Sequence, residues 1–190
     1  MDVTVAIPTF NSTCTIMSVL QRLLHQDVKP TILMIDNGSK DGTVEMLQAV
    51  IDNKWFGTAD IVLQTAPQLM GGREKNIPYM RHKLAQAVQT EYLFFLDSDV
   101  LLPGHCLLGL KEYMDEDINR QGVAVRYDPL ADHVQFGAIL MKTQIAKQIK
   151  WNTGEGKCEC RWAIESLKEM NPDWYVTLHP DYQARHLKGF

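Results

Sequence analysis

The 190-residue sequence has few of the features that mark secreted or membrane proteins. Its four cysteines, Cys14, Cys106, Cys158 and Cys160, are too few and too irregularly spaced for a disulfide framework, so we expect free thiols. No apolar run approaches the roughly 20 residues that cross a bilayer. The first residues, MDVTVAIPTF, lack the basic start and apolar core of a signal peptide. We therefore expect a cytoplasmic protein without a transmembrane segment.

The sequence also lacks a strong excess of positive or negative charge. Nineteen basic residues face 23 acidic ones without a Lys/Arg cluster, so we expect no nucleic-acid partner. The phosphate-binding patterns G-x-G-x-x-G and G-x-x-x-x-G-K-[ST] are absent, which disfavours a dinucleotide oxidoreductase and a P-loop NTPase. A composition of 45% hydrophobic and 22% charged residues is typical of a globular chain, and no linker or repeat divides it. We expect a single domain over residues 1–190.

What the sequence does contain is an alternation of apolar strands and amphipathic helices. Strands are expected at 3–8, 31–36, 60–64 and 92–96, with helical spacing of apolar residues between them. Asn11 or Ser12 is expected to cap the first helix, and Asn76 with Pro78 to open the third. The pattern predicts an α/β fold with a mainly parallel sheet. After Pro103 it loosens, with strands expected at 122–126 and 133–141 and helices at 105–116 and 142–149.

The stretch YLFFLDSDVLLP places two carboxylates at the exit of a wholly apolar strand. Asp97 and Asp99 are two residues apart, so in an extended chain they project to the same side. A D-x-D alone is weak evidence, because carboxylates often cap turns. Here, however, PTFN and DNGSKDG follow two other strands and are expected at the same sheet edge, where ligands of such folds bind. Carboxylate oxygens suit Mg²⁺ or Mn²⁺ together with a phosphorylated ligand.

The segment GGREK supplies two cations shortly before a helix. Arg73 and Lys75 are candidates to hold a diphosphate there, and a solvated basic turn is the alternative interpretation.

Four segments together carry a family resemblance: VAIPTFN, ILMIDNGSKDGT, REKNIPYMRHKLAQAVQTEY and LFFLDSDVLLP. With these motifs in this order over the first hundred residues, the chain resembles a family 2 glycosyltransferase of the GT-A fold, in the nucleotide-diphospho-sugar transferase superfamily. The resemblance implies a Rossmann-like central sheet flanked by helices. It further implies that residues 1–103 bind the nucleotide sugar and that residues 104–190 shape the acceptor side.

The resemblance also implies roles for the strand-end residues. It assigns the nucleotide sugar to Pro8, Thr9, Phe10, Asp36, Asn37, Arg73, Lys75, Asp97 and Ser98. Many members have two aspartates where this chain has Asp36 and Asn37, which leaves the base open, although an amide oxygen can still accept a base N–H. Asp99 is implied as a direct ligand of Mn²⁺ or Mg²⁺, and Asp97 as a partner of the ribose or of a metal-bound water. His186 is implied as a further metal ligand, in competition with His179.

The general base is harder to place. In the family it belongs to an acidic pair near the start of a late helix, and here Glu159 is followed by Cys160, with Glu155 as the fallback. Both glutamates would also favour a helix amino terminus by their charge alone. Cys158 and Cys160 could suggest zinc, but a single C-x-C is weak evidence, and we interpret these thiols as non-catalytic.

The resulting hypothesis is a metal-dependent, inverting, hexosyltransferase-like enzyme. It would move a sugar from a UDP-, dTDP- or GDP-sugar to a hydroxyl of a glycan, lipid-linked or protein acceptor. Two alternatives stay open. A sugar nucleotidyltransferase would share the fold, but its Gly-rich, Lys-containing signature is absent from PTFNSTC. A nucleotide-sugar-binding module without catalysis is favoured by the missing second acid after Glu159.

Overall fold

Three buried strands and one edge strand form the amino-terminal half of the sheet. β1 (Val3–Thr9), β2 (Thr31–Asp36) and β4 (Tyr92–Leu96) are almost fully buried, because helices cover both faces of the sheet. β3 (Ile61–Thr65) is partly exposed at the edge. β1 pairs in parallel with β2 and β4, and β2 with β3. Their carboxyl ends therefore meet at one side of the sheet.

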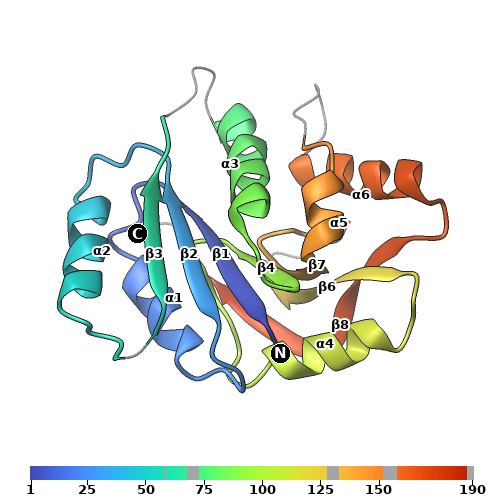
Figure 1. The fold of residues 1–190 in the computed structure, drawn as a ribbon, viewed down its shortest axis with the longest axis horizontal. Coiled ribbons are helices and arrows are strands. Elements are labelled where there is room, and N and C mark those ends of the chain that lie inside the picture. Colours follow the sequence, from blue (N-terminus) through green and yellow to red (C-terminus); the bar gives the residue numbers. More distant parts are fainter. Residues whose placement is uncertain (58, 68–72, 128–132, 152–157, 188–190) are drawn as a thin grey trace.

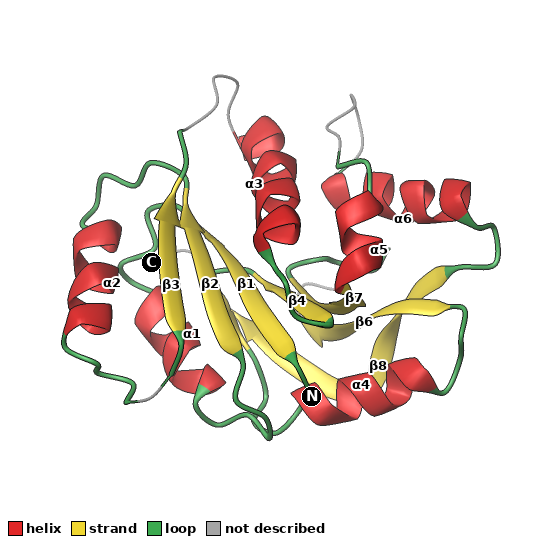
Figure 2. Cartoon of the chain, in the orientation of Figure 1, coloured by secondary structure: helices red, strands yellow, loops and turns green. Residues whose placement is uncertain are grey.

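The computed structural model describes residues 1–57, 59–67, 73–127, 133–151 and 158–187, without the side chains of residues 73–75. The described residues form one sheet in the order β3-β2-β1-β4-β7-β6-β8-β5 (Figures 1 and 2). The further strands are β5 (Val100–Leu101), β6 (Arg120–Tyr127), β7 (Ala138–Lys142) and β8 (Tyr175–His186). The helices are α1 (Ile16–Leu23), α2 (Thr43–Asp52), α3 (Arg73–Ala87), α4 (Leu107–Asp115), α5 (Thr143–Gln148) and α6 (Glu159–Met170).

The carboxyl-terminal half of the sheet is mixed. β7 is antiparallel to both β4 and β6, whereas β6 and β8 run in parallel. β8 then pairs antiparallel with the two-residue β5, through Val100 opposite His186 and Leu101 opposite Arg185. The expected α/β fold is thus confirmed, with a parallel arrangement from β3 to β4 and a mixed one beyond.

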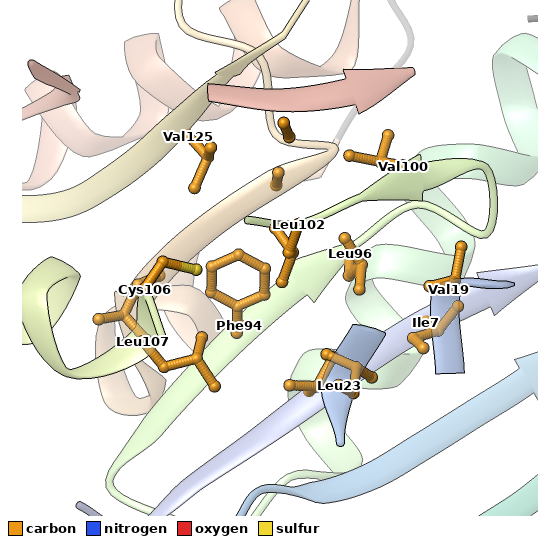
Figure 3. Close-up of a cluster of buried hydrophobic side chains, with 14 of the residues drawn as sticks. Ile7, Val19, Leu23, Phe94, Leu96, Val100, Leu102, Cys106, Leu107 and Val125 are labelled. Carbon is orange, nitrogen blue, oxygen red and sulfur yellow. The ribbon is translucent and has the colours of Figure 1, made fainter. Parts of the chain in front are cut away.

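Two apolar cores lie on opposite faces of the sheet because side chains alternate along each strand. Phe94 and Leu96 face a core with α1, α2 and α4, and Figure 3 shows Phe94 beside Cys106 and Leu107. Phe95 faces the other core, which is covered by α3, α5 and α6. Both cores together make the sheet a rigid base for its carboxyl-terminal edge. In the described ranges, no helix combines the length and the apolar character required to cross a membrane.

Several element boundaries differ from the expectations. α1 starts after Thr15, and neither Asn11 nor Ser12 caps it with a side chain. Instead the Ser12 carbonyl accepts the N–H groups of Thr15 and Ile16. α3 begins at Arg73, so Pro78 lies inside the helix and not at its start. β5 and β8 were not expected from the sequence, and they are the strands that bring the end of the chain to the D-x-D segment.

Asp41 joins the loop after β2 to the loop after β1. Its carboxylate accepts the N–H and hydroxyl of Thr43 at the start of α2 and the N–H and hydroxyl of Thr13. Burial works against the ionised carboxyl, but these donors outweigh it and lower the pKa of Asp41 to about 2. The ionised Asp41 side chain therefore stabilises the contact between the loop after β1 and the loop after β2.

We expect Asp41→Asn to lower the Tm by a few degrees at neutral pH. Because the folded-state pKa lies below the ordinary value of 3.8, the stabilisation is present above pH 3.8 and is lost as the pH falls towards about 2. The Tm difference between wild type and variant, followed by circular dichroism, should therefore shrink over that range. Asp173→Asn, at another exposed turn, is the control. A Tm difference that does not change with pH would contradict the assignment.

Candidate active site

A cavity of about 330 Å³ opens at the carboxyl ends of β1, β2 and β4. It is lined by the strand exits and by the first turns of α3: Pro8, Thr9, Phe10, Asn37, Asn76, Ile77, Met80, Asp97, Ser98 and Asp99. This is the edge at which parallel α/β sheets bind ligands. The sequence placed seven of these residues at the site, whereas Asn76, Ile77 and Met80 were not singled out as ligand contacts.

Asp97 and Asp99 both line this cavity, with 29% and 37% of their side chains exposed. Burial raises the pKa of Asp99, and the neighbouring Asp97 carboxylate raises it further. Nearby His186 opposes this shift. The two acids therefore repel each other across a partly buried space, and a cation bound between them would relieve that repulsion.

His186 reaches the acidic pair through the short β5–β8 ladder. Its Nε2 lies 3.1 Å from Asp99 Oδ2, and the N–H of Leu187 donates to the Asp99 carbonyl at 2.7 Å. The imidazole ring packs against Tyr127 at a centroid distance of 5.6 Å. His179, the competing histidine, instead stacks on Tyr182 and accepts the N–H of Asp181. Of the two candidates, the structure brings His186 to the acids.

Arg81 of α3 is the buried charge at the centre of the site, with only 1% of its side chain exposed. Its Nη2 donates to Asp97 Oδ1 at 3.0 Å and lies 3.5 Å from Glu159 Oε1. Burial alone would lower the pKa of Arg81, but the two carboxylates more than compensate, and the net shift is upward. Arg81 therefore stays charged and couples the D-x-D segment to α6. Arg81 was not among the site residues expected from the sequence.

Glu159 is the first residue of α6. Glu159 is not among the described residues that line the cavity. It is connected to Asp97 through Arg81, which contacts both carboxylates. About 18% of its side chain is exposed. Glu155, the fallback base, lies outside the described residues, as do the side chains of Arg73 and Lys75.

At the β2 exit, Asp36 and Asn37 have different surroundings. Asp36 is buried, and its carboxylate accepts the N–H groups of Gly38 and Ser39 and the hydroxyls of Thr9 and Ser39. Its acceptor capacity is used by the turn. Asn37 lines the cavity, and its buried Oδ1 has no partner within the described part of the chain. Asn37 is therefore the residue at this exit with an acceptor to offer a ligand.

Phe10 and Ser98 complete the cavity wall. Phe10 is 46% exposed, which leaves a face on which a flat ring could stack. The Ser98 hydroxyl lies 2.8 Å from the Ser12 hydroxyl and so joins the D-x-D segment to the loop after β1.

Gly137, just before β7, permits a close approach of side chains from two other strands. A Cβ at this position would lie 2.4 Å from both Asp97 Oδ2 and the Tyr127 hydroxyl, closer than real Cβ atoms come. The Gly137 carbonyl also accepts the N–H of Asp97 at 2.8 Å. The close approach at this glycine thus involves Asp97 and Tyr127 of the protein itself.

The fold is of the GT-A type, with a curled mixed sheet between helices and a cavity at its strand ends. The family model of Glycosyl transferase family 2 matches residues 4–163, and the chain therefore belongs to that family. No curated protein matches the sequence significantly.

Solved structures show the same fold at low sequence identity. A mannosyltransferase from Pyrobaculum calidifontis, solved with GDP-Man and Mn²⁺, has a TM-score of 0.77 at 16% identity, covering 98% of this chain and 57% of its own. TarS 1-349 from S. aureus with UDP-GlcNAc has a TM-score of 0.73 at 17% identity, covering 100% and 60%. Glucosyl-3-phosphoglycerate synthase from Mycobacterium tuberculosis, with Mn²⁺, UDP and phosphoglyceric acid, has a TM-score of 0.65 at 15% identity, covering 93% and 67%. The present chain thus spans less than two thirds of the TarS and mannosyltransferase chains.

We expect Arg81→Met to destabilise the protein by about 3 kcal/mol, because it leaves Asp97 and Glu159 without their buried counter-charge. Urea unfolding followed by tryptophan fluorescence measures the change. Arg22→Met, which removes an exposed arginine from α1, is the matched control and should have little effect. Equal stability of the two variants would show that the buried ion pairs are not needed for the fold.

Proposed function

We propose that the protein is a metal-dependent, inverting glycosyltransferase that moves a sugar from a nucleotide-diphosphate sugar to a hydroxyl acceptor. The observation that carries this proposal is the convergence of Asp99, His186 and the free acceptor of Asn37 around one strand-end cavity. The relatives solved with UDP-GlcNAc and with GDP-Man support a donor of this class.

The residues beside the cavity fit a divalent cation. Asp99 and His186 offer an oxygen and a nitrogen 3.1 Å apart, and the repulsion between Asp97 and Asp99 favours positive charge between them. Carboxylate and phosphate oxygens are hard ligands that suit Mn²⁺ or Mg²⁺, and the imidazole nitrogen of His186 would be a borderline additional ligand. Bound there, the ion would neutralise the charge that develops on the departing diphosphate. Asp97 is already paired with Arg81, so we assign the direct ligand role to Asp99 and contact with the ribose to Asp97.

The nucleotide base would lie at the other end of the cavity. Phe10 offers an exposed ring for stacking, and Asn37 Oδ1 can accept an N–H of uracil, thymine or guanine. Pro8 and Thr9, the last two residues of β1, line the cavity next to Phe10. The donor would therefore bind with its base near Phe10 and Asn37 and with its diphosphate near the carboxylates of Asp97 and Asp99.

Proton removal from the acceptor hydroxyl falls to Glu159. The Glu159 carboxylate lies 3.5 Å from Arg81 Nη2, which also binds Asp97. This contact holds the Glu159 carboxylate towards Asp97. A carboxylate in that position can take the proton as the hydroxyl attacks the sugar from the face opposite the diphosphate, which inverts the configuration.

A nucleotide-sugar-binding module without catalysis is the second candidate. It is favoured by one observation: Glu159 contacts Arg81 but does not lie among the described residues that line the cavity. Donor binding would then occur without transfer.

We expect Asp99→Asn to abolish the metal-dependent part of donor binding, which corresponds to at least about a tenfold loss of affinity. Isothermal titration with UDP- and GDP-sugars in Mn²⁺ or in EDTA measures this dependence. Asp181→Asn, an exposed aspartate of β8, should keep the wild-type response. If Mn²⁺ strengthens donor binding equally in wild type and Asp99→Asn, Asp99 is not the ligand.

We expect Glu159→Gln to lower donor turnover by about 100-fold while donor affinity stays within twofold of wild type. Nucleotide release from a panel of sugar donors with Mn²⁺, with and without simple sugar acceptors, provides the readout. Glu169→Gln, on the exposed face of the same helix, is the control. Binding of a donor by the wild-type protein with no turnover of any donor would instead support the binding module.

A further inference from the structure

A second group of potential metal ligands lies outside the candidate active-site cavity. His133 precedes β7, and Cys158 and Cys160 flank Glu159 at the start of α6. One ligand atom from each of the three residues lies within 4.8 Å of the others. His133 Nε2 is 3.0 Å from Cys158 Sγ. No step of the proposed transfer reaction uses these three side chains.

We propose that His133, Cys158 and Cys160 bind a Zn²⁺ ion. Two thiolates and an imidazole are the donor set that zinc prefers, in contrast to the carboxylates of the cavity. Two sulfurs bound to one tetrahedral zinc at about 2.3 Å are about 3.8 Å apart. The three ligand atoms lie within 4.8 Å of one another, and the closest pair, His133 Nε2 and Cys158 Sγ, would move apart from 3.0 Å to about 3.5 Å around the ion.

Burial raises the pKa of the Cys160 thiol, and the Glu159 carboxylate, 3.6 Å from its Sγ, raises it further, so a bound metal ion would have to displace the proton. The N–H of Phe136 donates to Cys160 Sγ at 3.3 Å, and such a donor would stabilise the sulfur as a metal-bound thiolate. Cys160 is buried, whereas Cys158 and His133 are only partly buried. An ion can thus reach the three ligands from the side of Cys158 and His133 while Cys160 anchors it in the protein.

Zinc binding here would connect two separate segments of the chain. It would link the segment before β7 to the first turn of α6, and it would place a ligand on each side of Glu159. Both thiols would lose their protons to solvent on binding, and His133 would bind through a neutral ring nitrogen. Three protein ligands leave the fourth tetrahedral position for water or another group. This site is independent of whether the protein transfers sugars.

Cobalt substitution tests the site through a signal that only thiolates give. Addition of Co²⁺ to reduced, metal-free protein should produce sulfur-to-cobalt charge-transfer absorption and the intense visible bands of tetrahedral Co²⁺, and one equivalent of Zn²⁺ should remove both. Cys158→Ser and His133→Gln, at partly exposed positions, should weaken Zn²⁺ binding by at least about tenfold in competition with a chromogenic chelator. Circular dichroism confirms that both variants are folded.

Two controls separate this site from other ligands. Cys14→Ser removes an exposed thiol elsewhere and should keep the cobalt spectrum. Asp99→Asn removes the proposed manganese ligand and should also keep it. Absence of charge-transfer absorption in the wild-type protein would overturn the proposal. The same holds for a spectrum that Cys158→Ser leaves unchanged, or for equal losses in Cys14→Ser and Cys158→Ser.

Discussion

The buried guanidinium of Arg81 is the charge around which the rest of the site is organised. A charged group with 1% of its side chain exposed needs counter-charges within hydrogen-bonding distance, and Asp97 and Glu159 supply them from two different elements. Helix α3, the exit of β4 and the start of α6 are thereby joined at one point. A movement of α6 relative to α3 would separate Arg81 from Glu159, so the ion pairs hold the proposed base at a defined distance from Asp97.

Backbone pairing supplies the other half of this geometry. The β5–β8 ladder aligns His186 with Val100, and that alignment leaves the imidazole beside Asp99. At Gly137 the missing side chain lets Asp97 and Tyr127 approach the same backbone position. Each acid of the D-x-D is thus positioned by a different neighbour, Asp97 by Arg81 and the segment before β7, and Asp99 by the last strand. This difference agrees with the separate roles proposed for the two carboxylates.

The sequence revealed the parallel half of the fold because β1, β2 and β4 are continuous apolar runs, which follow from burial on both faces. It did not reveal β5, which has two residues, or β8, whose side chains are mostly half exposed and lack a clear period. Arg81 was missed because an arginine in a helix is normally solvated. A signal was present, since Ile77, Leu84 and Ala85 lie on the same helical face as Arg81 and are apolar. His133 carries no such signal, because only the fold brings it to cysteines 25 and 27 positions away in the chain.

The contact between Asp99 and His186 spans 87 positions of the chain. The parallel strands β1 to β4 can associate as soon as the first hundred residues are available, whereas the β5–β8 ladder, which closes a loop of similar length to the β1–β4 pairing, requires residues up to His186. During synthesis on a ribosome the cavity wall formed by β1, β2 and β4 would therefore exist well before the corner formed by Asp99 and His186. A nascent chain would bring His186 to Asp99 only when β8 has left the exit tunnel and docked.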